Sequence, residues 1–218
     1  MNNEEGIPLV DAYGQVNRAL HNGNFSVWWL IGAVLSLWFT AYKGLAVLFG
    51  SATTESGKPV GPVFAIHLVT CCLISWICIW NLFHTPSHGP IYRTMHVVLG
   101  RSAMISGVLS AGAGFYAAWW ERYDTSNLGF TIGVSVGGCL QLVAQTAGWY
   151  FIRQRNVLKH QKAMYSVFFY GCLIPMWLRF PNLVFGLPIP DWWSIVAIAC
   201  SVALCRLAFA AHTNKRSV

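Results

Sequence analysis

The stretch "VGPVFAIHLVTCCLISWICIWNLFH" covers residues 60–84 and contains no Asp, Glu, Lys or Arg. A helix needs about 20 mostly apolar residues to cross the hydrocarbon core of a bilayer, and this stretch is long enough. Backbone polar groups find no water in lipid, so they must be satisfied within the segment, as they are in a helix. The stretch therefore predicts a transmembrane helix.

Five more apolar stretches of similar length lie on either side of it, which predicts six transmembrane helices in all. They cover approximately residues 25–50, 94–120, 127–152, 161–180 and 191–211. The alternating pattern of a transmembrane β-barrel is absent. The connections are short, so neighbouring helices should be antiparallel. We predict an all-α, multi-pass integral membrane protein whose main partner is the lipid bilayer.

The overall composition agrees with this prediction. The chain has 218 residues, of which 56% are hydrophobic and only 10% are charged, and its mean hydropathy is +0.51. Ordinary soluble domains carry about 25% charged residues. A soluble domain of this size would therefore need more polar surface than the sequence supplies.

Three parts of the chain differ in composition. Residues 1–24 form a polar N-terminal segment without a cleavable signal-peptide pattern. One interpretation of residues 7–21 is a short helix that lies in the membrane interface. Residues 25–212 form the six-helix transmembrane domain, and residues 213–218 form a basic C-terminal tail.

Basic residues are distributed unequally between the two sides of the predicted bundle. With six spans, both termini share one side, here called side A, with the connections near residues 85–93 and 153–160. That side carries Arg18, Arg93, Arg101, Arg153, Arg155, Lys159, Lys162, Arg206, Lys215 and Arg216, whereas the opposite side B carries Lys43, Lys58, Arg122 and Arg179. The positive-inside rule makes side A cytoplasmic, or the matrix or stromal side of an organelle.

The net charge of +7 mostly reflects this asymmetry. No basic face with interleaved aromatic residues lies outside the membrane, so the charge does not predict nucleic-acid binding. All seven cysteines fall inside predicted spans, and none has CxxC spacing. We interpret them as buried free thiols that act as small hydrophobic residues.

Two histidines begin predicted helices on side A. His96 begins the third helix and His160 the fifth. These helices run in the same direction, so the two imidazoles should lie at nearly the same depth. Ionisable residues inside a membrane usually mark a site, and helix-bundle cores commonly hold cofactors. The pair therefore predicts a site in which each imidazole supplies one axial nitrogen to a haem.

The residues near these histidines suit a flat cofactor. Gly100 lies one turn deeper than His96 on the same face. That face continues through Ala103, Gly107, Ala111 and Gly114. The side A opening of the predicted haem site carries Arg93, Arg101, Lys159 and Lys162. Basic side chains pair well with carboxylates such as haem propionates. Alternatively, the small residues serve close helix packing, and the basic residues anchor the helix ends on anionic headgroups.

Residues 64–180 resemble the uncharacterised membrane family DUF2306, which is similar in general character to the six-helix haem proteins of the cytochrome b561 group. The resemblance is carried by His67 in "FAIHL", "HVVLGR" (96–101), "HQKAM" (160–164) and "LRF" (178–180). It implies a haem b held by His96 and His160. The second haem of that group needs histidines on the second and fourth helices, and the fourth helix here has none.

The role of His67, on the second helix near side B, has several interpretations. Cys172, Met176 and Arg179 are expected at similar depth on the fifth helix. His67 and Met176 could ligate a second haem. Alternatively, His67 pairs with a polar neighbour or with Arg179, or binds a quinone-like head group. Gln141 and Gln145 face one way on the fourth helix, either as links between helices or as lining of a substrate path.

The leading functional hypothesis is a membrane b-type cytochrome-like electron-transfer protein or oxidoreductase subunit. Its electrons would come from ascorbate, a quinol or a redox partner protein. A competing site places His84 and His88 beside His96 and His160 as zinc or copper ligands. Two other classes remain: a small transporter or channel, and a structural subunit of a membrane complex without a cofactor.

Overall fold

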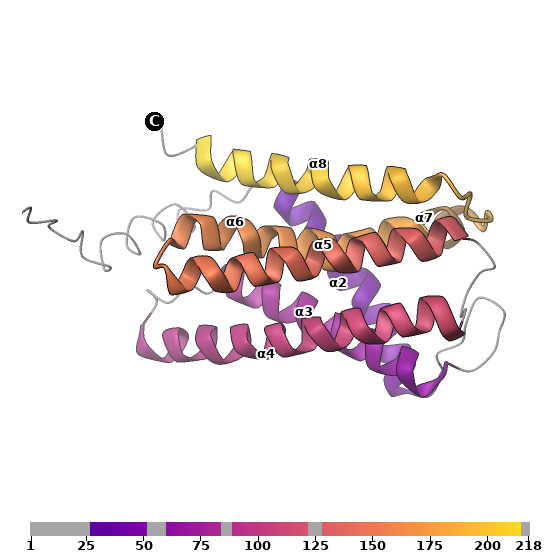
Figure 1. Ribbon diagram of the computed structural model, residues 1–218, viewed down its shortest axis with the longest axis horizontal. Coiled ribbons are helices and arrows are strands. Elements are labelled where there is room, and N and C mark those ends of the chain that lie inside the picture. The colour runs from indigo at the N-terminus through magenta and orange to yellow at the C-terminus, as the bar shows by residue number, and fades with distance from the viewer. Residues whose placement is uncertain (1–26, 52–59, 84–88, 122–127, 215–218) are drawn as a thin grey trace, which may run out of the picture.

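The computed structural model describes residues 27–51, 60–83, 89–121 and 128–214, and all regular structure in these ranges is helical (Figure 1). Six helical segments are long and apolar enough to cross a membrane, which confirms the predicted number. They are residues 30–47, 62–82, 90–120, 128–153, 157–185 and 193–211. Residues 1–24, His84, His88 and residues 215–218 lie outside the described residues, whereas residues 213 and 214 of the predicted tail belong to the last helix.

The helices follow one another with short connections. In order they are α2 (Val27–Leu48), α3 (Pro62–Phe83), α4 (Pro90–Tyr116) with η2 (Ala117–Glu121), α5 (Leu128–Arg153), α6 (Val157–Phe168) with η3 (Phe169–Leu173) and α7 (Ile174–Phe185), and α8 (Trp193–Asn214). In Figure 1, α4 and α6 begin at the left end, where α5 and α8 finish. The left end is therefore side A.

Four of the spans form a closed ring. α3 packs on α4, α4 on α5, α5 on α6, and the fifth span packs back on α3 through α6 and η3. α4 and α6 have no substantial contact with each other, so they occupy diagonal positions in the ring. α2 and α8 pack on each other and on η3, outside this ring.

The fifth span is the most deeply buried part of the bundle. Phe168, Phe169, Leu173, Ile174 and Leu178 each have 0% of their surface exposed. Their burial follows from position, because α2, α3, α5 and α8 all contact η3. Apolar side chains that face outward on the other helices suit contact with lipid.

Two prolines shape the fifth span. Residues 161–180 were predicted as one helix, but the span runs from Val157 to Phe185 and contains the π-helical segment η3. Pro175 lies just after η3 and has no N–H for an intrahelical hydrogen bond. Pro181 likewise leaves the carbonyl of Trp177 without its usual donor, and the indole Nε1 of Trp193 donates to that carbonyl over 2.6 Å.

Six crossings predict that both termini face the same side of the membrane, because each crossing reverses the side on which the chain continues. Epitope tags placed at each terminus should therefore show the same protease sensitivity in sealed vesicles. Tags that become sensitive on opposite faces would contradict six crossings. Comparing inside-out and right-side-out vesicles identifies which side carries the basic connections.

Candidate functional site

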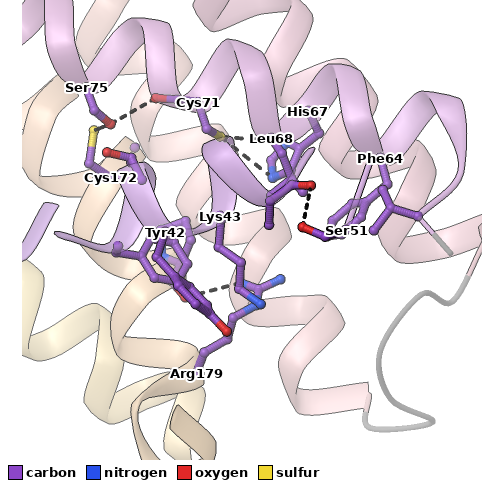
Figure 2. A pocket seen from close by; sticks show the side chains of 16 residues that line it. Tyr42, Lys43, Ser51, Phe64, His67, Leu68, Cys71, Ser75, Cys172 and Arg179 are labelled. Carbon is purple, nitrogen blue, oxygen red and sulfur yellow. Dashed lines mark hydrogen bonds between the residues drawn. The ribbon is translucent and has the colours of Figure 1, made fainter. Parts of the chain in front are cut away.

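A partly enclosed cavity lies among α2, α3, η3 and α7 in the side B half of the bundle (Figure 2). Its volume is about 110 Å³. The polar side chains that line it are Thr40, Tyr42, Lys43, Ser51, His67, Cys71, Ser75, Cys172 and Arg179. The structure therefore brings together His67 and Arg179, two of the predicted site residues.

The imidazole of His67 is held by α4. Its Nδ1 lies 2.8 Å from the backbone carbonyl oxygen of Ser110. A carbonyl can only accept, so Nδ1 carries the hydrogen and Nε2 is the remaining nitrogen. Gly114 makes this approach possible, because a Cβ at that position would lie 2.8 Å from the ring. The ring also stacks on Phe64, with centroids 5.8 Å apart.

Thiols and hydroxyls continue the polar wall beside His67. The Sγ of Cys71 lies 2.9 Å from the Oγ of Ser110 and 3.7 Å from Nε2 of His67. Ser75 donates to Sγ of Cys172 over 2.8 Å, and its Oγ is also 2.9 Å from the carbonyl oxygen of Cys71. These contacts connect α3 with α4 and η3 through small polar groups.

Arg179 is the buried cation of this cavity. Only 8% of its surface is exposed, and it lies six residues before the end of α7, about 9 Å along the helix. Its Nη1 donates to the carbonyl of Pro175 over 3.2 Å, and Cζ lies 4.9 Å from the centroid of the Phe130 ring. No carboxylate of the described residues forms an ion pair with it, and among those residues its five N–H donors have one carbonyl acceptor.

Lys43 adds a second basic group to the lining. In Figure 2 its side chain extends from α2 toward the same part of the cavity as that of Arg179 on α7. The ammonium lies 5.4 Å from the Tyr42 ring centroid. Among the described residues that line the cavity, three are basic or imidazole groups and none is acidic. The charge of the described lining therefore favours a negatively charged or strongly electron-rich occupant.

The other two predicted histidines lie at side A. His96 is half-buried on α4, and His160 is half-buried on α6. Nδ1 of His160 lies 2.9 Å from the carbonyl oxygen of Gly148 on α5, so Nδ1 carries the hydrogen and Nε2 is left for another partner. The helices that carry the pair are diagonal in the ring, as a ligand between them would require.

The small-residue face of α4 is only partly open. A Cβ at Gly107 would overlap the amide group of Gln145, and Gly114 packs on His67. Close packing is therefore the role of this face toward side B. A Cβ at Gly100, by contrast, would have Nδ2 of Asn81 as its nearest neighbour, at 3.7 Å. At Gly100, near side A, the neighbouring side chain is therefore at ordinary contact distance, and a small side chain would be tolerated.

The basic residues of side A point in different directions. Arg93 and Arg101 are exposed on α4. The ammonium of Lys162 lies 5.6 Å from the ring centroid of Phe209 on α8, and that of Lys159 lies 5.6 Å from the ring of Phe151. The structure therefore does not bring Lys162 together with the arginines of α4.

Two other predictions concern the bundle interior. Gln145 donates through Nε2 to the carbonyls of Ala103 and Met104, which confirms it as a link between helices. Gln141 packs against Gly171 instead, and its Nε2 has no hydrogen-bond partner among the described residues. All seven cysteines are free, as predicted, but only four are buried: Cys71 and Cys200 are half-buried and Cys139 is exposed.

Metal ligation by several side chains finds no support in the part of the chain that is described. No group of three or more His, Cys, Asp or Glu residues there could hold a metal ion. His84 and His88 lie outside that part. Met176 belongs to the apolar core and does not line the cavity with His67.

No family model, curated protein or solved structure matches the chain. The resemblance to DUF2306 and to the cytochrome b561 group therefore stays a prediction. Sequence reasoning overlooked Cys71 and Ser110 as neighbours of His67, and Lys43 as part of the same cavity lining. Cys71 carried a signal, because it follows His67 by four residues and shares its helix face. Ser110 carried no such signal, because only the packing of α4 on α3 brings it next to His67.

Proposed function

We propose that this chain is a membrane electron-transfer protein with one haem b, held between α4 and α6 at side A. His96 and His160 would supply the axial nitrogens, and Arg93 and Arg101 the charges for the propionates. When bound, haem would supply one-electron redox chemistry at a potential set by its axial ligands. Electrons would come from a quinol, ascorbate or a redox partner protein.

The observation that carries this proposal is the hydrogen bond from His160 to Gly148. Histidines that bind metals almost always donate their second ring N–H to a carbonyl, a carboxylate or water, which fixes the ring and raises the basicity of the ligand. His160 is held in this way by the protein itself. Its Nε2 is therefore the nitrogen that is left to coordinate.

The close packing of α4 toward side B favours one haem rather than two. Between His96 and Gly107, helix α4 rises about 16 Å. At Gly107, the side chain of Gln145 fills the contact between α4 and α5. Toward side B, the ring of His67 fills the gap at Gly114, and its Nδ1 is committed to Ser110. Within this proposal, His67 has a role other than that of an axial ligand.

The spectrum of the purified protein tests the proposal. We expect protein expressed with ample haem to show a Soret band, and a sharp α band after reduction, because two imidazoles give low-spin iron. The pyridine haemochrome assay should give one haem b per chain. Protein that is folded in detergent but shows no Soret band would contradict the proposal.

The side B cavity favours a small-solute transporter as the second candidate. A cation-lined space within the membrane-spanning part is a usual feature of substrate pathways. This candidate needs no haem, so a purified protein that is folded but colourless would favour the transporter over the electron-transfer protein. A structural subunit without a cofactor would have no evident need for a buried arginine with so few partners among the described residues.

A further inference from the structure

We infer that the side B cavity is a binding site for a small planar oxyanion, and specifically for a short-chain monocarboxylate the size of acetate. Binding there would not depend on haem, because the cavity and the side A histidines lie at opposite ends of the bundle. Four features point to this ligand: the charge of the described lining, the arginine donors that have no partner among the described residues, the volume of the cavity and its apolar wall.

Arg179 supplies a charge that has no counterion among the described residues. Placing a charged arginine inside a membrane costs about 2.5–17 kcal/mol depending on how the cost is measured, so such residues usually have a partner. Arg179 has only one carbonyl acceptor and the face of Phe130 among the described residues. Its planar fork matches the two oxygens of a carboxylate, with which it can form two parallel hydrogen bonds.

The volume of the cavity limits the size of its occupant. A cavity of roughly 150 Å³ is known to hold benzene, so a cavity of about 110 Å³ holds about four or five non-hydrogen atoms. Acetate has four non-hydrogen atoms. A quinone ring with its two oxygens has eight and is too large to be enclosed there. The volume therefore favours a small anion over a quinone head group as the enclosed ligand.

The lining also has a place for a methyl group. Phe39, Phe64, Leu68 and Pro175 supply an apolar wall beside the polar groups. A carboxylate with a short alkyl group would present its oxygens to Arg179 and its carbon to this wall. Inorganic anions such as chloride satisfy only the charge and leave the apolar wall without a partner.

Cys71 gives a direct measure of occupancy, because its thiol lines the cavity. The small neutral reagent methyl methanethiosulfonate should modify Cys71 of the full chain in detergent, and mass spectrometry reports the rate at each cysteine. Exposed Cys139 serves as an internal control, and buried Cys78 reports whether the fold is intact. Even at the best efficiency of small ligands, four atoms bind no tighter than roughly 40 µM, so acetate is titrated into the tens of millimolar.

We expect acetate to slow modification of Cys71 along a saturable curve, by about tenfold when acetate reaches nine times its dissociation constant. The rate at Cys139 should not change. Chloride at equal ionic strength and benzoate, which is too large, should protect little. Arg179→Lys should weaken protection by at least about tenfold, because a charge-assisted hydrogen bond from the fork is lost. Arg206→Lys on the exposed face of α8 is the matched control.

Three results would overturn the inference. One is an absence of protection by acetate in wild-type protein whose Cys78 stays unmodified. Another is equal protection by chloride, which would show that the cavity senses ionic strength alone. The third is undiminished protection in a folded Arg179→Lys variant. Because none of these measurements uses haem, they are separable from failure of the proposed function.

Discussion

Replacing His160 by alanine is expected to abolish the sharp α band of the reduced protein. One remaining imidazole cannot keep the iron six-coordinate and low-spin. Even partners outside the first coordination shell are worth 10–100-fold in metal affinity, so we expect the loss of a ligand to weaken haem binding by more than about 100-fold. His96→Ala should have the same effect. Spectra and the haem-to-protein ratio of purified variants measure it.

Added imidazole distinguishes ligation from a structural role. If the alanine variant keeps its fold, free imidazole should occupy the space left by the side chain and restore the low-spin spectrum. His67→Ala is the matched control, since His67 is committed to Ser110 at the other end of the bundle and should leave the spectrum unchanged. Wild-type spectra in both His96→Ala and His160→Ala would contradict their assignment as ligands.

Replacing Gly107 by alanine is expected to destabilise the contact between α4 and α5 by about 2–4 kcal/mol, because overpacking and broken buried hydrogen bonds both contribute. The added Cβ would overlap the Gln145 amide. That amide cannot simply move aside, since Nε2 is bonded to the carbonyls of Ala103 and Met104. Thermal unfolding in detergent, followed by circular dichroism or intrinsic fluorescence, should show a clear decrease in midpoint.

Gly112→Ala is the control on the same helix. Nothing lies within 4 Å of a Cβ at Gly112, so its stability should be unchanged or raised by the better helix propensity of alanine. The double variant Gly107→Ala, Gln145→Ala removes the overlapping amide. It should therefore be less destabilised than the sum of the two single variants. Additive losses would show that Gly107 and Gln145 do not interact as described.

The six helices were predictable because a bilayer imposes a length and an apolar composition on any segment that crosses it. Their ends were less predictable. The third span begins at Pro90 rather than near residue 94, and α6 begins at Val157 rather than near residue 161. In both places polar or basic residues occupy the first helical turn, so hydropathy alone does not mark the true start. Pro90 and the N-cap Asn156 do mark it.

The candidate sites were predictable only in part. Helix order and direction placed His67 near Arg179, and the structure brings them to one cavity. The small face of α4 was ambiguous, because glycine and alanine serve equally to receive a cofactor or a neighbouring side chain. Only the three-dimensional packing assigns Gly107 to Gln145 and Gly114 to His67. Likewise, no sequence pattern could show that Lys162 would lie over Phe209.

The π-helical segment η3 separates the two ends of the fifth span. A π turn holds more residues than an α turn, and each residue of an α-helix advances the side-chain direction by about 100°. His160 lies before this segment and contacts Gly148, whereas Arg179 lies after it and lines the cavity.

The extra residue in η3 therefore sets the direction in which the side chains of α7 point relative to those of α6. Deleting one residue from 169–173 would turn every side chain of α7 by about 100° relative to α6. His160 would keep its place, whereas the guanidinium of Arg179 would leave the cavity. A single residue in the middle of one span thus determines whether a helix that serves one end of the bundle can also serve the other.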